Sequence, residues 1–374
     1  MYLVADENLS LTEYFFSSFG TVKTYAGRGI TVENLIDAEV LLVRSVTKVT
    51  PQLLQAATDL SASHKRIGFV GSATIGTDHL DVAGLQASGV TVANAPGCNA
   101  QAVAEYVVTA ILTLQPEGAV QAGFTVGIVG LGNVGQRLGV LAKRLGWRVM
   151  GVDPFVIRDD IEQMQLREML PQVDVVSLHV PITNKGQDQT YHLMDEETFA
   201  FLKPNAMLIN SARGAVIAEA ALLADFAHAR AKGVEIRSVI LDVFEHEPKI
   251  SARLLDDLAL ATPHIAGYSL EGKAKGTEMI YQAFCQWQAV SPTRTLENML
   301  PTLPQLFNPH KNLIEQLPAL LSVLYPIQQD DAALRACLRD DEHLGESFVD
   351  AESFDRLRKE YPLRREWSSY GDQG

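Results

Sequence analysis

The sequence has few cysteines, a deficit of positive charge and no long apolar run, and each shortage excludes a class of protein. Its three cysteines, Cys98, Cys285 and Cys337, lie far apart and form no C-x-x-C pair. This excludes a disulfide scaffold and a cysteine-rich zinc module, and it is typical of a reducing compartment. Against 45 aspartates and glutamates stand 31 lysines and arginines, so the formal net charge is −14. Such a chain has no general attraction for nucleic-acid phosphates or an anionic membrane surface, and anionic ligands would need local cationic pockets.

No apolar run approaches the roughly 20 residues that a membrane-spanning helix needs. Residues 1–8 (MYLVADEN) lack the cationic and long apolar segments of a signal peptide. Hydrophobic residues nevertheless make up 47% of the 374 residues, enough for the cores of two or three domains. The composition predicts a cytoplasmic protein that binds neither nucleic acid nor a membrane.

Short apolar segments alternate with helical ones, and this alternation is typical of parallel α/β units. A first stretch has predicted strands over 2–5, 40–43, 67–70 and 91–93, and a buried helix follows over 100–114. A second stretch has predicted strands over 125–129, 148–152, 173–178, 206–210 and 238–243, with helices over 135–145 and 218–231. These strands are nearly all apolar, as expected where helices cover both faces of a sheet.

The last part of the chain differs in composition. A helical pattern runs from residue 270 to about residue 290, and four prolines then occur between Pro292 and Pro309. Proline at this spacing forbids a long helix and indicates a linker. The remainder, from about residue 312, has its own apolar stretch over 313–324 and a charged end, which predicts a small third domain.

Residues 130–135 (GLGNVG) match the G-x-G-x-x-G pattern of dinucleotide-binding loops. The match follows an apolar strand and opens a helix, and Asp153 lies 18 residues after Gly135, near the spacing of the acid that binds the ribose hydroxyls. Gly130 permits the tight turn, Gly132 lets the backbone approach the pyrophosphate, and the helix N-terminus attracts phosphate. An acid at position 153 repels a 2′-phosphate. The pattern therefore predicts NAD as cofactor, the alternative being an ordinary glycine-rich turn without a ligand.

Three residues of the second stretch match the tasks of hydride transfer from a hydroxyl-bearing carbon. His264 is suited to moving a proton near neutral pH. Glu247 can orient that imidazole, and the guanidinium of Arg213 can hold a carboxylate or polarise a carbonyl. Each residue alone has an ordinary structural interpretation; together, behind a dinucleotide loop, they predict a dehydrogenase site.

The motifs GLGNVG (130–135), NSARG (210–214), LDVFEHEP (241–248) and TPHIAGY (262–268) resemble those of the D-2-hydroxyacid dehydrogenase family. Four further segments resemble one member of the family that acts on a phosphorylated acid: VRSVTKV (43–49), VGSATIGTDHLD (70–81), APGCNAQAVAEYV (95–107) and LRKEYPLRREWSS (357–369). The resemblance implies NAD-dependent oxidation of 4-phospho-D-erythronate to its 2-oxo acid, a step in making pyridoxal phosphate.

The resemblance also implies the architecture. A Rossmann-type NAD-binding domain (95–268) is expected to be inserted in a flavodoxin-like α/β substrate domain (1–94 and 269–290). A small C-terminal α+β domain (291–374) is expected to form a homodimer.

Residue roles follow from the resemblance, motif by motif. The implied catalytic residues are Arg213, Glu247 and His264, with His264 as acid/base. The implied cofactor contacts are Gly130, Gly132, Asn133, Val134, Gly135, Asp153, Val180, Ser211, Ala212, Arg213, Asp242 and Gly267. The implied substrate contacts are Ser45, Thr74 and Tyr268. Val180 stands where a relative carries Thr, so we expect it to contact the cofactor through its backbone alone.

The substrate phosphate needs cationic partners in this acidic chain. Arg44 and Lys48 flank Ser45 and are the first candidates. A second basic cluster lies in the tail: Arg358, Lys359, Arg364 and Arg365. Either one or more tail arginines reach an active site, in the same or a partner subunit, or they form ion pairs with Glu360 and Glu366.

Two other functions stay open at this point. Another 2-hydroxyacid dehydrogenase, for example one acting on 3-phosphoglycerate, would share the catalytic residues. A non-catalytic NAD-sensing protein would share the cofactor loop, but it would not need Arg213, Glu247 and His264. No set of His, Asp and Glu shows metal-ligand spacing, so we expect no metal, and Cys98 has no task in hydride transfer.

Overall fold

The computed structural model describes residues 1–115, 123–341 and 345–372. The chain forms two compact units, one of residues 1–99 and 269–302, the other of residues 100–268 and 303–374. Residues 100–268 of the second unit are thus inserted between the two parts of the first, and residues 303–374 follow it. Residues 303–374, for which the sequence predicts a separate domain, group with the second unit; the three-domain division stays a prediction.

The first unit is built on a five-stranded parallel sheet with the order β2-β1-β3-β4-β5. Its strands are β1 (Tyr2–Asp6), β2 (Thr21–Tyr25), β3 (Val40–Val43), β4 (Phe69–Ser72) and β5 (Thr91–Ala93). Its helices are α1 (Thr12–Phe16), α2 (Pro51–Leu60), α3 (Val82–Ala87) and α10 (Leu270–Trp287). This strand order is that of flavodoxin-like folds.

Both faces of this sheet are covered because successive side chains of a strand point to opposite faces. Leu41 and Val43 pack on one face with residues of α2 and α3. Val40 and Leu42 pack on the other with α1 and with Ile280 and Phe284 of α10. A strand that is buried on both faces must be apolar throughout, as the run Val40–Val43 is.

The second unit contains a seven-stranded parallel sheet with the order β12-β11-β10-β9-β6-β7-β8. Its strands are β6 (Thr125–Val129), β7 (Arg148–Val152), β8 (Glu162–Gln163), β9 (Val175–Leu178), β10 (Met207–Asn210), β11 (Val239–Leu241) and β12 (Leu260–Ala261). When β6 is numbered 1 and the sheet is read from β8, the order begins 3-2-1-4-5-6, which is the Rossmann order. The predicted fold class is confirmed.

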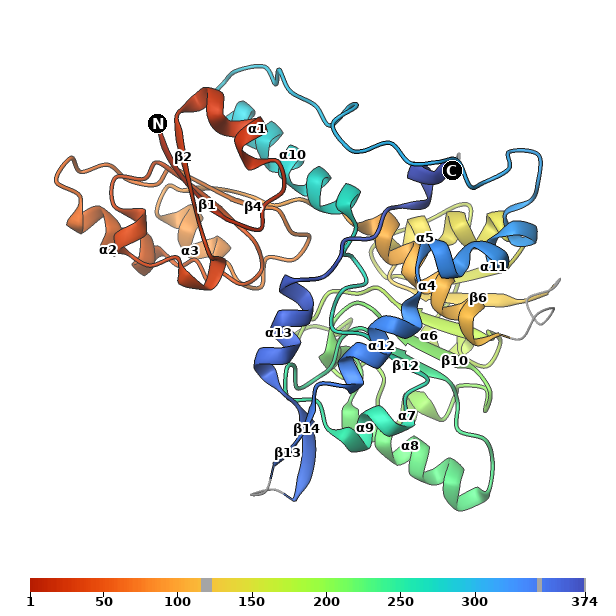
Figure 1. Ribbon diagram of the computed structural model, residues 1–374. Coiled ribbons are helices and arrows are strands. Elements are labelled where there is room, and N and C mark those ends of the chain that lie inside the picture. Colours follow the sequence, from red (N-terminus) through yellow and green to blue (C-terminus); the bar gives the residue numbers. More distant parts are fainter. Residues whose placement is uncertain (116–122, 342–344, 373–374) are drawn as a thin grey trace. The chain divides into compact units, whose positions relative to one another are not determined.

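Helices cover both faces of this sheet as well (Figure 1). They are α4 (Ala100–Leu114), α5 (Asn133–Arg144), α6 (Leu166–Met169), α7 (Glu196–Phe199), α8 (Glu219–Lys232) and α9 (Ala252–Asp257). Residues of α4 and α5 pack with Val126 and Ile128 of β6 in one core, and residues of α8 and α9 pack with Leu208 and Leu241 in the other.

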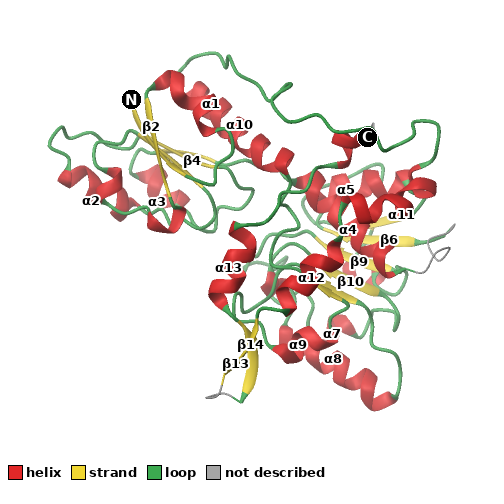
Figure 2. Cartoon of the chain, in the orientation of Figure 1, coloured by secondary structure: helices red, strands yellow, loops and turns green. Residues whose placement is uncertain are grey.

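The C-terminal segment supplies α11 (Leu313–Leu324), α12 (Ile327–Arg335), the antiparallel hairpin of β13 (Leu338–Asp341) and β14 (Glu346–Val349), and α13 (Ala351–Lys359). Figure 2 shows this hairpin apart from the parallel sheet. Leu317 of α11 joins one core of the second unit, whereas Leu334 of α12 and Phe354 of α13 join the other. The segment therefore contributes to both faces, and Asp331 accepts a hydrogen bond from the N–H of Ala261 in the edge strand β12 (2.8 Å).

Short 3-10 turns complete the secondary structure: Ser17–Phe19, Gly27–Gly29, Glu33–Leu35, Gly214–Val216 and Trp367–Tyr370.

Candidate active site in the second unit

The predicted site residues of the second unit follow the carboxyl ends of its strands. Gly130 follows β6, Asp153 follows β7 and Val180 follows β9. The residues after β10, β11 and β12 include Arg213, Glu247 and His264 in the same way. Carboxyl ends of parallel strands meet at one edge of a sheet, where α/β folds bind their ligands.

The glycine loop has the close backbone packing that the sequence predicts. The left-handed φ of Gly130 (93°) suits glycine, and a Cβ there would lie 2.7 Å from the carbonyl oxygen of His179. A Cβ on Gly135 would overlap the carbonyl oxygen of Gly130, whereas a Cβ on Gly132 would meet no atom within 4 Å. Protein packing therefore requires glycine at 130 and 135 but leaves open space at 132.

That open space lies at the start of α5, where Asn133 and Val134 follow Gly132. No side chain caps this helix. The first N–H groups of an uncapped helix, with its dipole, attract phosphate. The uncapped helix and the free space at Gly132 fit the pyrophosphate of NAD.

Asp153 is held against the glycine loop. Its Oδ2 accepts a hydrogen bond from the Leu131 N–H (2.7 Å), and its Oδ1 accepts from the N–H groups of Phe155 (2.8 Å) and Val156 (3.0 Å). Val180 lies beside Gly130, because a Cβ on that glycine would be 3.0 Å from a Val180 methyl. The contacts of Asp153 and Val180 with a cofactor stay predictions.

The segment after β10 carries a buried hydroxyl with no partner among the described residues, Ser211 Oγ. Its neighbours are fixed by Asn210, whose side chain accepts from the Ala212 N–H (3.1 Å) and donates to the Arg213 carbonyl (2.9 Å). A Cβ on Gly214 would overlap the Phe244 carbonyl. The backbone beside Arg213 therefore lies against the segment that leads to Glu247.

His264 and Glu247 form a hydrogen-bonded pair. The imidazole Nδ1–H donates to Glu247 Oε2 at 3.0 Å, and Glu247 Oε1 accepts from the Phe244 N–H at 2.9 Å. Burial would raise the pKa of Glu247, but the charge of His264 and these hydrogen bonds hold it below its usual value. With Nδ1 engaged, Nε2 of His264 is the nitrogen left to exchange a proton with a ligand.

Asp242 organises the backbone around His264. Its buried carboxylate accepts from the hydroxyl of Thr262 and the N–H of Ile265, both at 2.7 Å, and from the N–H of Ala266 at 2.9 Å. Burial raises its pKa to about 6. The sequence predicts a cofactor contact for Asp242, which stays a prediction; the contacts observed hold the loop that also contains Gly267.

Two residues that the sequence analysis did not single out complete this network. Tyr106 of α4 and Thr262 are joined by a hydrogen bond between their hydroxyls (2.8 Å). Because Thr262 donates to Asp242, Tyr106 is the donor in this pair. No spacing in the sequence connects Tyr106 with the loop 156 positions later, so only the fold reveals it.

The tail arginines differ in their surroundings. Arg364 donates to the backbone carbonyls of Ile265 (3.0 Å), Tyr268 (3.4 Å), Ala102 (3.1 Å) and Ala266, and it stacks 4.5 Å from the Tyr325 ring. Arg358 approaches the Tyr268 hydroxyl. Arg365 donates to Ser369 (3.2 Å). The tail thus meets the His264–Tyr268 loop of its own chain.

The predicted substrate contacts Ser45 and Thr74 belong to the first unit. Ser45 follows β3 and Thr74 follows the adjacent β4, so both lie at one edge of that sheet. Thr74 hydrogen-bonds Ser72 (2.7 Å) and donates to the Gly76 carbonyl (2.8 Å). Ser45 is exposed. Their contact with substrate stays a prediction.

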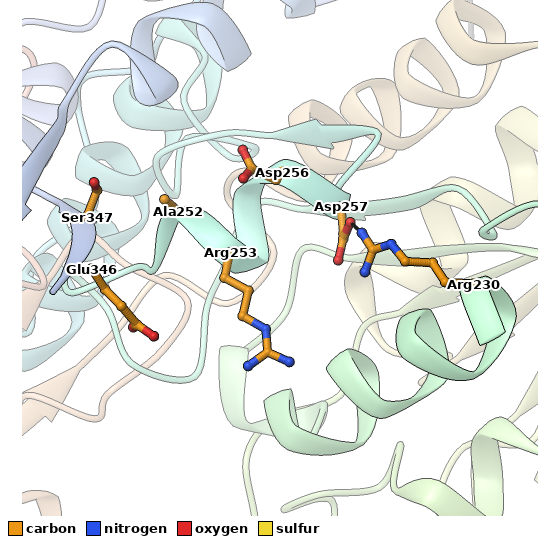
Figure 3. Close-up of a pocket in the computed structure, with 7 residues that line it drawn as sticks. All are labelled: Arg230, Ala252, Arg253, Asp256, Asp257, Glu346 and Ser347. Atoms are coloured by element: carbon orange, nitrogen blue, oxygen red, sulfur yellow. Dashed lines mark hydrogen bonds and ion pairs between the residues drawn. The ribbon is translucent and has the colours of Figure 1, made fainter. Parts of the chain in front are cut away.

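A hollow of about 330 Å³ in the second unit contains none of the predicted site residues (Figure 3). It is lined by Arg230, Ala252, Arg253, Asp256, Asp257, Glu346 and Ser347. Arg230 lies near the end of α8 and pairs with Asp257 at the end of α9. The lining comes from α8, α9 and β14, and not from the segments that carry Gly130, Arg213 or His264.

Among residues 1–115, 123–341 and 345–372, no helix is long and apolar enough to cross a membrane. The same residues contain no group of three His, Cys, Asp or Glu placed to hold a metal ion.

Comparison with known proteins agrees with this geometry. The family model "D-isomer specific 2-hydroxyacid dehydrogenase, NAD binding domain" matches residues 113–266, and a domain of unknown function (DUF3410) matches residues 305–371. A solved D-lactate dehydrogenase from Aquifex aeolicus, complexed with NAD and lactic acid, superposes with a TM-score of 0.60 at 24% identity, covering 77% of this chain and 96% of that one.

Two curated relatives are much more similar. The erythronate-4-phosphate dehydrogenase of Acinetobacter baumannii is 53% identical over 372 residues, 99% of each chain. That of Acinetobacter baylyi is 50% identical over 373 residues, again 99% of each chain. The chain belongs to the family of these erythronate-4-phosphate dehydrogenases, within the D-isomer specific 2-hydroxyacid dehydrogenases.

Proposed function

We propose that this chain oxidises 4-phospho-D-erythronate to (R)-3-hydroxy-2-oxo-4-phosphooxybutanoate with NAD, a step in making pyridoxal 5′-phosphate. The similarity to the curated relatives over 99% of the chain supports the substrate. The single structural observation that carries the chemistry is the His264–Glu247 pair at the strand edge that also bears the glycine loop.

Bound NAD supplies the acceptor for the hydride that leaves C2 of the substrate. Nε2 of His264 takes the proton of the C2 hydroxyl, and Glu247 stabilises the imidazolium that results. Arg213 holds the carboxylate and polarises the developing carbonyl. One C–H and one O–H bond break, the C=O bond forms, and the proton is carried by His264.

The cofactor is held by groups of three kinds. The N–H groups of Gly132 to Gly135 at the start of α5 bind the pyrophosphate, and Asp153 accepts from the ribose hydroxyls. The segment Ser211–Arg213, Asp242, Gly267 and the backbone of Val180 contact the nicotinamide end. The unpartnered Ser211 hydroxyl supports this placement.

Ser45, Thr74 and Tyr268 complete the substrate contacts of this proposal. We also propose, from the family resemblance, that the chain works in the cytoplasm as a homodimer through its C-terminal segment. Sedimentation of the full chain would show a mass of about twice 40.9 kDa.

The decisive assay is NAD reduction with 4-phospho-D-erythronate, unphosphorylated erythronate and 3-phosphoglycerate side by side. Each is run with NAD alone and with a 2-oxo acid acceptor, in case the reduced cofactor is not released. We expect fast turnover of the phosphorylated erythronate alone. Turnover of 3-phosphoglycerate instead would overturn the proposed substrate. The absence of NAD reduction with all three acids would favour an NAD-sensing protein.

A further inference from the structure

The position of Arg358 is fixed by the helix that carries it. Asp350 caps the start of α13 by accepting from the Ser353 N–H (2.8 Å), and Phe354 is buried in a core of the second unit. The Arg358 guanidinium lies over the Phe354 ring, 5.7 Å from its centre. A side chain near the end of an anchored helix is held in one position and does not move freely in the solvent.

Few protein groups satisfy the guanidinium of Arg358. Its one hydrogen bond to a described residue is long, 3.5 Å from Nη2 to the Tyr268 hydroxyl. Its Nε is buried without a partner among the residues that the structure describes. A guanidinium has five N–H donors, and leaving them unpaired away from water is unfavourable. Arg364, with four carbonyl acceptors, has no such shortage.

Arg358 belongs to the same part of the molecule as the catalytic pair. Tyr268 follows His264 by four positions in one loop. The charge of Arg358 acts on Glu247 as well, since it is among the causes that lower the pKa of that carboxylate. Conversely, Tyr268, Glu247 and Asp242 help to keep the pKa of Arg358 raised against the effect of its burial.

We propose that Arg358 binds the phosphate of the substrate and thereby makes the enzyme specific for phosphorylated 2-hydroxy acids. This proposal rests on the proposed function, in which Arg213 takes the carboxylate. Among the candidates for the phosphate that the sequence offers, Arg44 and Lys48 belong to the first unit and Arg358 belongs to the second, with His264 and Glu247. The planar fork of arginine matches two phosphate oxygens, and a phosphate dianion supplies the acceptors that Arg358 lacks.

The test compares two substrates in Arg358→Ala and in the control Arg356→Ala. Arg356 lies on the same helix and is exposed, where it donates to Ser353 (3.0 Å). In Arg358→Ala we expect kcat/KM for 4-phospho-D-erythronate to fall about 100-fold, the effect of losing two charge-assisted hydrogen bonds. For unphosphorylated erythronate it should change less than about threefold. Arg356→Ala should leave both values unchanged.

Arg358→Lys separates charge from geometry. Lysine keeps the positive charge but loses the planar fork, so it should restore part of the preference for the phosphorylated substrate. Equal losses with both substrates in Arg358→Ala would overturn the proposal, because they would show that Arg358 acts by positioning Glu247 or Tyr268.

A binding measurement keeps this test independent of turnover. Inorganic phosphate is titrated into the NAD-bound wild type and variants by calorimetry. We expect the wild type and Arg356→Ala to bind it and Arg358→Ala to bind it at least about tenfold more weakly. Equal phosphate binding by all three would refute the role of Arg358, even if the substrate itself proved to be a different phosphorylated acid.

Discussion

Alanine at two positions of the glycine loop should have opposite consequences. At Gly132 the backbone is extended, with φ −68° and ψ −153°, and the new methyl would meet no atom within 4 Å. We therefore expect the free energy of unfolding of Gly132→Ala to stay within about 1 kcal/mol of the wild type. At Gly135 the methyl would overlap the Gly130 carbonyl, a backbone atom that cannot rotate away. Such overpacking costs about 1 to 3 kcal/mol.

Although Gly132→Ala should leave the stability of the protein nearly unchanged, it should weaken the binding of NAD. If the space at Gly132 receives the pyrophosphate, the methyl displaces it, and a tenfold weaker affinity corresponds to about 1.4 kcal/mol. At NAD concentrations about 100 times the wild-type Kd, bound cofactor stabilises the wild type by about 2.7 kcal/mol. Gly132→Ala would gain only about 1.4 kcal/mol under the same conditions.

Thermal unfolding with and without NAD measures both effects, since 1 kcal/mol shifts Tm by about 2 to 4 °C in a unit of this size. Without NAD, the Tm of Gly132→Ala should equal that of the wild type; with NAD, it should be lower than that of the wild type. Gly135→Ala should melt lower under both conditions. A Gly132→Ala variant that gains as much from NAD as the wild type would refute the assignment of this space to the cofactor.

Two further substitutions test the proposed site, and a third tests the buried carboxyl group of Glu105 in α4 through its effect on stability. Glu247→Gln keeps the shape of the side chain but removes the charge that stabilises the His264 imidazolium, so kcat should fall about 100-fold or more. The affinity for NADH, measured by fluorescence, should be unchanged. Turnover at the wild-type rate would contradict the role of Glu247. Asp153→Asn removes the charge that repels a 2′-phosphate, so the ratio of kcat/KM for NADP to that for NAD should rise at least about tenfold, and an unchanged ratio would argue against it. Burial, followed by the charge of Glu366, raises the pKa of Glu105 well above its usual value, so the folded protein keeps a proton that the unfolded chain releases near pH 4. The contribution of Glu105 to wild-type stability is therefore complete below that pH and is lost as pH rises. The free energy of unfolding of Glu105→Gln should exceed that of the wild type by an amount that grows as pH rises above about 5, by at most about 1.4 kcal/mol per pH unit. A difference that does not change with pH would contradict this.

The buried strands of both sheets could be predicted because burial on two faces demands an uninterrupted apolar run. The predicted strands 40–43, 125–129 and 148–152 coincide with β3, β6 and β7. The edge strand β2 was missed, since its sequence TVKTY is polar and largely exposed. The short strands β8 and β12 have two residues each, too few to show a pattern.

The candidate site was only partly predictable for a related reason. Motif spacing indicates which residues follow a strand, and Glu247 and His264 do lie in hydrogen-bond contact. Spacing does not indicate which backbone groups a side chain meets. The carboxylate of Asp242 accepts hydrogen bonds from Thr262, Ile265 and Ala266, on both sides of His264. The guanidinium of Arg364 donates to the carbonyls of Ile265 and Ala102, which lie on separate segments. These contacts depend on how the C-terminal segment covers the sheet.

The attachment of Arg364 to the loop of His264 has a consequence for how the enzyme is made. His264 is synthesised 100 positions before the guanidinium that holds its loop. A nascent chain can therefore contain the glycine loop and every proposed catalytic residue while four backbone carbonyls still lack their donor. Activity in such a chain would be acquired late, as a property of the completed product, and a chain released before residue 364 would lack the donor that holds these carbonyls.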